Sequence, residues 1–195
     1  MGRHREFDSS EALSAALHVF WRKGFEGTSL TDLTEAMGIN RPSLYAAFGN
    51  KEDLFRKALD QYMRTCIGFF EAALDRPTAR EAAEAVLLGY ADAQTDTANP
   101  PGCLVTHGAL ACSEASEPIR QELLRLRVLA EDRVRERLER ATREGDLPAD
   151  ADPADLASYV MTVKQGMAVQ AASGADRATL HAVVRNAMRA WPGQG

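Results

Sequence analysis

The sequence of 195 residues has only three cysteines and no apolar run of the roughly 18–20 residues that a membrane span needs. Cys66, Cys103 and Cys112 are too few for a disulfide framework, so we expect reduced thiols. The first residues are charged and do not resemble a secretory signal, which predicts a cytoplasmic protein with no membrane contact. Apolar and polar residues nowhere alternate over the length of a strand, which predicts an all-α chain.

Motifs that support catalysis or metal binding are also missing. The sequence contains no G-x-S-x-G elbow, no phosphate-binding glycine loop and no H-E-x-x-H. Its histidines, His4, His18, His107 and His181, do not cluster with other ligands at metal-binding spacing. Cys103 and His107 share a helix face, but two ligands do not make a site. We therefore expect no enzyme activity, no cofactor and no metal.

Acidic residues outnumber basic ones, and the net charge is −5. Residues 1–57 carry eight basic and eight acidic side chains, so the whole deficit lies in residues 58–195. A negative chain is a poor general attractant for nucleic acid. If the protein binds DNA, the arrangement of charges in the first segment must provide the contacts, and the acidic body must stay away from the duplex.

The most informative stretch is GFEGTSLTDLTEAMGINRPSLYAAFGNKEDLF, residues 24–55. Ser29 and Asp32 have the spacing of a capping box, which predicts a helix start. Gly38 predicts its end, because glycine adopts left-handed backbone conformations without steric cost. Asn40 suits an N-cap and Pro42 the first turn of a second helix. The stretch therefore predicts two short helices joined by a tight turn, which is the arrangement of a helix-turn-helix.

The residues alone leave two interpretations of this stretch. The two helices can form a DNA-reading unit, or they can be an ordinary packed hairpin. The preceding helix, about Ser10–Lys23, has a full apolar stripe, and Gly24-Phe25 ends it. The presence of this helix directly before the two short ones favours the interpretation as a DNA-reading unit.

Residues 15–55 resemble the DNA-binding domain of the TetR family of bacterial transcriptional regulators. The features that carry the resemblance are Phe20, Gly24, Phe25, Thr28-Ser29, Gly38, Leu44-Tyr45, Phe48 and Lys51. Thr34 departs from the alanine that the family usually has, and Ala46-Ala47 stand where larger side chains are common. Base contacts at these two alanines would be methyl contacts only.

The resemblance implies which residues approach DNA. Those implied at base edges are Thr31, Arg41, Pro42 and Ser43, and those implied at phosphates are Thr28, Ser29, Tyr45 and Lys51. It also implies a homodimer that binds double-stranded operator DNA, most often as a repressor, and that answers to a small-molecule effector.

The rest of the chain is expected to be helical. Further helices are predicted over Asn50–Leu74, from Pro77 past Tyr90, and over Cys103–Ser113, Ser116–Glu144, Ala154–Ser173 and Asp176–Trp191. With the first three, this makes about nine helices. We expect a helix-turn-helix domain at 1–50 and an effector-binding and dimerisation domain at 51–195.

Two groups of residues are candidates for the functions of the second domain. The effector pocket is expected to include Phe69, Phe70, Tyr90, Cys103, His107, Met167 and Gln170. The dimer interface is expected to include Leu156, Val160, Val163, Leu180, Val184 and Met188. The apolar faces of the last two helices could instead close the core of a single chain.

Cys103 follows Pro-Pro-Gly and opens a helix, where a thiolate is stabilised. Lys164 is an isolated charge on an apolar helix and could lie nearby. Members of the TetR family that sense electrophiles or oxidants use a reactive cysteine, so the resemblance implies a cysteine-based sensor as one version of the regulator. A packed thiol beside a snorkelling lysine is the other version. The rival to any regulator is an all-α carrier or enzyme with a purely structural hairpin.

Overall fold

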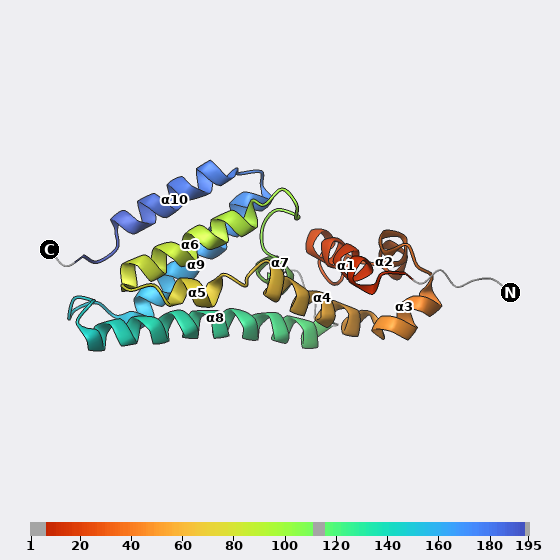
Figure 1. The fold of residues 1–195 in the computed structure, drawn as a ribbon, viewed down its shortest axis with the longest axis horizontal. Coiled ribbons are helices and arrows are strands. Elements are labelled where there is room, and N and C mark those ends of the chain that lie inside the picture. Colours follow the sequence, from red (N-terminus) through yellow and green to blue (C-terminus); the bar gives the residue numbers. More distant parts are fainter. Residues whose placement is uncertain (1–6, 111–115, 194–195) are drawn as a thin grey trace.

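The computed structural model describes residues 7–110 and 116–193, and these contain ten helices and no strand. Figure 1 shows them in two groups, with α1–α3 at one end and a long helical bundle at the other. The helices are α1 (Ser9–Lys23), α2 (Leu30–Met37), α3 (Arg41–Phe48), α4 (Lys51–Thr65), α5 (Phe70–Leu74), α6 (Ala79–Gln94), α7 (Leu104–Leu110), α8 (Glu117–Glu144), α9 (Pro153–Ala172) and α10 (Arg177–Arg189).

The first group is held together by an aromatic core. Phe20 of α1 meets Phe55 of α4 edge-to-face, with ring centroids 5.1 Å apart, and Phe25 meets the same ring at 5.3 Å. Such edge-to-face pairs contribute about 0.5–1.5 kcal/mol beyond the area that they bury. Helices α2 and α3 pack against α1 and α4 through Leu33 and Leu44, which are fully buried.

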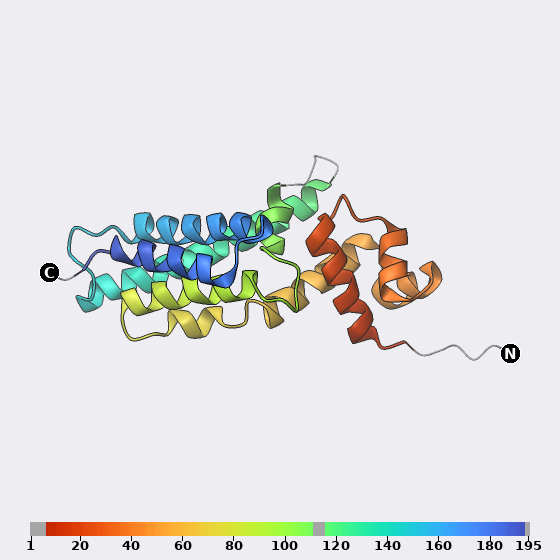
Figure 2. The same ribbon diagram turned by 90° about the horizontal axis from the view of Figure 1, so that it is seen from above.

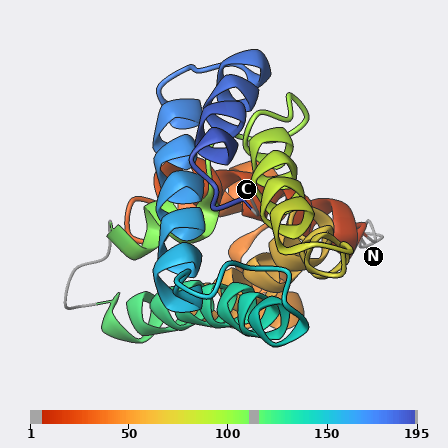
Figure 3. The same cartoon turned by 90° about the vertical axis from the view of Figure 1, so that its left-hand side faces the viewer.

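The second group is a bundle of α6, α8, α9 and α10. Helix α9 packs against both α8 and α6, and α10 covers α6 and α9 on the side away from α8. Figures 1 and 2 show α8 running the length of this bundle, and Figure 3 shows α8 and α10 on opposite sides of it. Helix α7 contacts α8, α9 and α1, so it lies between the bundle and the first group.

One predicted helix is interrupted. The expectation of a single helix over Asn50–Leu74 is wrong, because α4 ends at Thr65 and α5 begins only at Phe70. The turn between them places the ring centroids of Phe69 and Phe70 at 5.2 Å and 6.0 Å from the ring centroid of Tyr90. At Gly68 a Cβ would lie 2.6 Å from the carbonyl oxygen of Arg64, so a larger residue would not fit this turn.

No helix in the described part of the chain combines the length and apolar character required to cross a lipid bilayer.

Candidate functional site

The helix-turn-helix is built by local hydrogen bonds that the sequence predicts. The Ser29 hydroxyl accepts from the N–H of Asp32 at 3.0 Å, and the Asp32 carboxylate accepts from the N–H of Ser29 at 2.9 Å. Gly38 ends α2 with φ 65°. Asn40 then caps α3 by accepting from the N–H of Ser43 at 2.8 Å. Both helix starts and the turn are confirmed.

Helix α3 has one buried and one exposed face. Leu44 and Phe48 lie in the core, while Arg41, Pro42 and Tyr45 are exposed and Ser43 is half-buried. The Arg41 guanidinium donates to the hydroxyl of Thr31 on α2 at 3.2 Å. Arg41, Pro42 and Ser43 therefore lie at the N-terminal end of α3, and the hydrogen bond from Arg41 brings Thr31 of α2 beside them.

The residues expected to contact phosphates differ in how far they are exposed to solvent. Ser29 is exposed and Tyr45 is 48% exposed. Lys51 is half-buried, and its Nζ lies 4.4 Å from the centroid of the Phe25 ring. Burial lowers the pKa of Lys51. Thr28 is buried, and its hydroxyl donates to the carbonyl of Gly24 at 2.6 Å. As placed, its side chain supports the turn after α1 and does not face solvent.

A second candidate site is a small cavity where five helices meet. Its water-sized space is about 20 Å³, which is close to the volume needed for one water molecule. It is lined by Tyr62, Met63, Ile67, Tyr90, Cys103, Val105, Leu126, Arg127, Ala130, Met161 and Lys164. These residues come from α4 and the turn after it, α6, the start of α7, α8 and α9.

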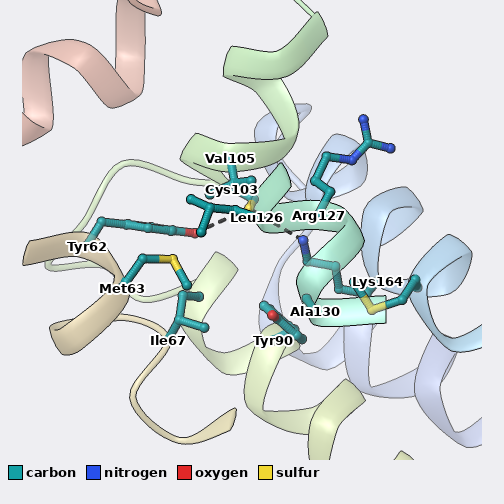
Figure 4. A pocket seen from close by; sticks show the side chains of 11 residues that line it. Tyr62, Met63, Ile67, Tyr90, Cys103, Val105, Leu126, Arg127, Ala130 and Lys164 are labelled. Atoms are coloured by element: carbon teal, nitrogen blue, oxygen red, sulfur yellow. Dashed lines mark hydrogen bonds between the residues drawn. The ribbon is translucent and has the colours of Figure 1, made fainter. Parts of the chain in front are cut away.

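Three ionisable side chains, those of Tyr62, Cys103 and Lys164, meet in this cavity. The Lys164 ammonium lies 3.7 Å from the sulfur of Cys103 and donates to the Thr106 hydroxyl at 3.3 Å. The Tyr62 hydroxyl donates to the same sulfur at 3.3 Å. Figure 4 shows both side chains directed at Cys103. Cys103 is 1% exposed and Lys164 3%, so the expectation of a snorkelling lysine is wrong.

The surroundings of Cys103 favour its ionised form. Burial by itself would raise the pKa of the thiol, but the Lys164 charge and hydrogen bonds from Thr106 and Tyr62 outweigh it, and the pKa is lowered. Burial raises the pKa of Tyr62 well above its usual value, so Tyr62 remains a proton donor.

The expected pocket residues are only partly brought together. Tyr90 and Cys103 line the cavity, whereas Phe69 and Phe70 pack on the Tyr90 ring without lining it. His107 hydrogen-bonds to the backbone of Ala168 and does not line the cavity. Met167 is buried and Gln170 is exposed, and neither lines the cavity.

Sequence reasoning also missed residues that line the cavity. Tyr62 and Arg127 carry polar groups to it, and Met63, Ile67, Val105, Leu126, Ala130 and Met161 supply its apolar wall. Lys164 was recognised only as a possible neighbour of Cys103, because it is a charge on an otherwise apolar helix. Cys112 lies outside the described residues.

The six residues expected at the dimer interface contribute to the core of the single chain. Val160, Leu180, Val184 and Met188 are buried, and Leu156 and Val163 are half-buried against the core. The large apolar side chains that α9 and α10 leave exposed are different ones: Tyr159 at 36%, Val169 at 48% and Val183 at 37%. The burial of four of these residues, Val160, Leu180, Val184 and Met188, is a correction, because they close the protomer before any partner is added. Leu156 and Val163 keep exposed surface, so their place at an interface stays a prediction.

Both the helix-turn-helix and the helical bundle match known protein families. Residues 12–58 match the family described as bacterial regulatory proteins, tetR family, and residues 79–188 match the tetracyclin repressor-like C-terminal domain. The HTH-type transcriptional repressor ComR of Escherichia coli K12 is 33% identical over 98% of this chain and 92% of its own. BdcR of the same organism, also an HTH-type transcriptional repressor, is 38% identical over 55% of each chain.

A solved structure shares the whole fold. The TetR family transcriptional regulator CifR, as a cysteine mutant complexed with 26-base-pair double-strand operator DNA, is 44% identical with a TM-score of 0.91. The match covers 98% of this chain and 100% of that chain. These findings confirm the predicted all-α class with its N-terminal helix-turn-helix. The chain belongs to the TetR family of bacterial regulatory proteins.

Proposed function

We propose that the protein is a dimeric one-component transcriptional repressor that binds palindromic operator DNA in the cytoplasm and responds to a small-molecule effector. The observation that carries the proposal is the exposed N-terminal end of α3, where Arg41 is held by Thr31. A guanidinium held in this way can make the bidentate contact that guanine offers in the major groove. Relatives named as repressors and a neighbour bound to operator DNA support the same assignment.

The effector site of this proposal is the cavity around Cys103. Tyr62 lines the cavity from α4, and its ring lies edge-to-face on Trp21 of α1 with centroids 4.7 Å apart. A ligand that moves Tyr62 therefore acts on the helix that supports the DNA-binding unit. We keep the division of the chain after residue 50, with α4 belonging to the effector-binding part and contacting the DNA-binding part through Tyr62.

The dimer of this proposal uses the exposed faces of α9 and α10. Tyr159, Val169 and Val183 are large apolar side chains left in solvent on these two helices. A second copy related by two-fold symmetry would bury them and place two α3 helices for two half-sites. The two-fold symmetry of such a dimer explains why its operator would be a palindrome.

The test is binding of the purified protein to the DNA upstream of its own gene, measured by fluorescence anisotropy at physiological salt. We expect specific binding that exceeds binding to a scrambled duplex by about 10³-fold or more. The Arg41→Ala variant serves as the matched control and should lose about 1–3 kcal/mol of its affinity for the specific duplex. Equal affinity for both duplexes would overturn the proposal and favour the rival, a carrier or enzyme with a structural hairpin.

A further inference from the structure

Two cationic side chains line the cavity around Cys103, and no carboxylate among the described residues lines it with them. They are Lys164 of α9, which is 3% exposed, and Arg127 of α8, which is half-buried. Neither belongs to an ion pair in the described part of the chain. The Cys103 thiol, whose sulfur lies 3.7 Å from the Lys164 ammonium, can supply one negative charge. Even with a thiolate, the lining carries one positive charge in excess.

The Arg127 guanidinium is only partly satisfied by hydrogen bonds. One terminal nitrogen donates to the side-chain oxygen of Gln165 at 2.7 Å, while Nε is buried and has no partner among the described residues. Glu131, one helical turn further along α8, accepts from the Ser158 hydroxyl at 2.6 Å, and no ion pair joins it to Arg127. Figure 4 shows the guanidinium directed away from the Lys164 ammonium. Arg127 therefore keeps an unused N–H and a charge that no carboxylate pairs.

The other polar groups of the cavity can also donate to an anion. The Lys164 ammonium donates to the Thr106 hydroxyl at 3.3 Å and otherwise meets sulfur. The Tyr62 hydroxyl donates to the Cys103 sulfur at 3.3 Å, and burial raises the pKa of Tyr62, so it keeps its proton. A thiol sulfur is a weak acceptor, whereas a carboxylate oxygen is a strong one. A carboxylate in this cavity would therefore receive stronger bonds from both side chains.

The rest of the lining is apolar and comes close to solvent. Met63 of α4 and Leu126 and Ala130 of α8 are half-buried, so the cavity approaches the surface between these two helices. The unbranched side chain of Met63 can move to admit a molecule. The present free space of about 20 Å³ holds no more than a water molecule, so an organic ligand also needs Tyr62 to move. An apolar body with one anionic group matches this lining.

We propose that the effector is a small organic anion, an apolar body with one carboxylate, bound noncovalently by Lys164 inside the cavity and by Arg127 at its half-buried side. This rests on the proposed function, since it names the class of ligand that the same site receives. The carboxylate draws the Tyr62 hydroxyl away from the Cys103 sulfur. Because the Tyr62 ring packs on Trp21 of α1, this movement reaches the DNA-binding unit.

The test compares two carboxylates with their uncharged amides, which have nearly the same shape. The probes are benzoate with benzamide and hexanoate with hexanamide. Isothermal titration calorimetry on the full chain should show each acid binding at least about tenfold more tightly than its amide. The acids should also weaken operator binding in anisotropy titrations. Acids that bind no better than their amides, or that bind without changing operator affinity, overturn the inference.

Substitutions at the two cations test which groups recognise the carboxylate. Arg127→Gln should weaken benzoate binding by about tenfold and leave benzamide binding unchanged. Arg125→Gln is the matched control, because Arg125 is exposed on the same helix and does not line the cavity, and it should change neither. Lys164→Met should abolish the preference for the acid in a chain that thermal unfolding shows to be folded. A preference that survives Arg127→Gln contradicts the inference, whether or not Lys164→Met folds.

A substitution of the thiol tests whether Cys103 takes part in recognition. Cys103→Ser should keep the preference for benzoate over benzamide, and intact mass should show no adduct on the natural chain. Loss of the preference in Cys103→Ser would assign recognition to the thiol and count against the two cations. If the protein without ligand does not bind its operator, the proposed function fails instead, while calorimetry on the protein alone still reports whether the cavity prefers an acid.

Discussion

The two ends of the molecule are stabilised in different ways. Around α1–α3 the interior is apolar and aromatic, and the one buried polar side chain among the described residues 7–50 is Thr28, which is satisfied within its own turn. The bundle instead buries Gln94, Thr106, Ser116, Arg137 and Lys164. The capping hydrogen bonds of the DNA-binding end join residues close in sequence, whereas Gln94, Arg137 and Lys164 in the bundle bond to partners 58 to 70 residues away.

The largest effect should come from placing a charge in the bundle core. Val184 is 0% exposed, so Val184→Glu would bury an unpaired carboxylate and cost at least about 4 kcal/mol. We expect loss of the folded bundle in thermal unfolding. Val183→Glu on the exposed face is the matched control and should leave the fold intact while shifting the dimer to monomer in sedimentation. A stable folded monomer from Val184→Glu would return this residue to the interface.

The next effect concerns a buried cation that joins distant segments. Arg137 of α8 is 5% exposed and donates to the carbonyls of Leu74, Arg76 and Pro77 at 2.9–3.1 Å. Arg137→Met would leave these acceptors without their donor, at a cost of about 2–4 kcal/mol in chemical denaturation.

A neighbouring arginine on the same helix provides the control for this loss. Arg140 is 45% exposed and lies 3.7 Å from Glu144. Arg140→Met should change stability by less than about 0.5 kcal/mol. Similar losses from both substitutions would show that helix propensity, and not the bridge to the α5–α6 turn, is responsible.

The same contrast explains what could be predicted from the sequence. Ser29 with Asp32, Gly38 and Asn40 act within four residues, so the sequence is sufficient to place the helix-turn-helix. The end of α4 depends on Phe69 and Phe70 meeting Tyr90, and only Gly68 marks it locally.

The pocket and the interface were harder to predict for the same reason. Tyr62, Cys103 and Lys164 come from three segments 41 and 61 residues apart, and nothing local shows that they meet. Periodicity identified the apolar faces of α9 and α10, but it cannot tell an apolar face that closes its own chain from one that meets a second copy.

At the DNA-binding end the expected effects are on affinity. Arg41→Ala should cost about 1–3 kcal/mol of binding free energy on the operator and relax the sequence preference at one base pair in each half-site.

Lys51→Ala should weaken binding to all duplexes alike, because Lys51 at the start of α4 is placed to contact a phosphate. It should also lower the slope of log affinity against log salt concentration by about one per half-site. Anisotropy titrations on operator and scrambled duplexes at several salt concentrations separate the two roles. A uniform loss from Arg41→Ala would make it a phosphate contact, and an unchanged slope would remove Lys51 from the interface.

The smallest effect is on the pH dependence of the helix-turn-helix. A hydrogen bond from Lys23, whose Nζ lies 2.6 Å from the carboxylate, together with bonds from Ser29, lowers the pKa of Asp32 from 3.8 to about 2. Since the folded pKa is depressed, the stabilisation is present above pH 3.8 and is lost as the pH falls toward 2. A carboxyl titration followed by NMR should place the Asp32 midpoint near 2, and Lys23→Ala should move it back toward 3.8. The pair is partly exposed, so added salt should reduce the shift. A midpoint near 3.8 in the natural chain would mean that neither Lys23 nor the Ser29 bonds of the capping box stabilise the Asp32 carboxylate, and it would contradict this prediction.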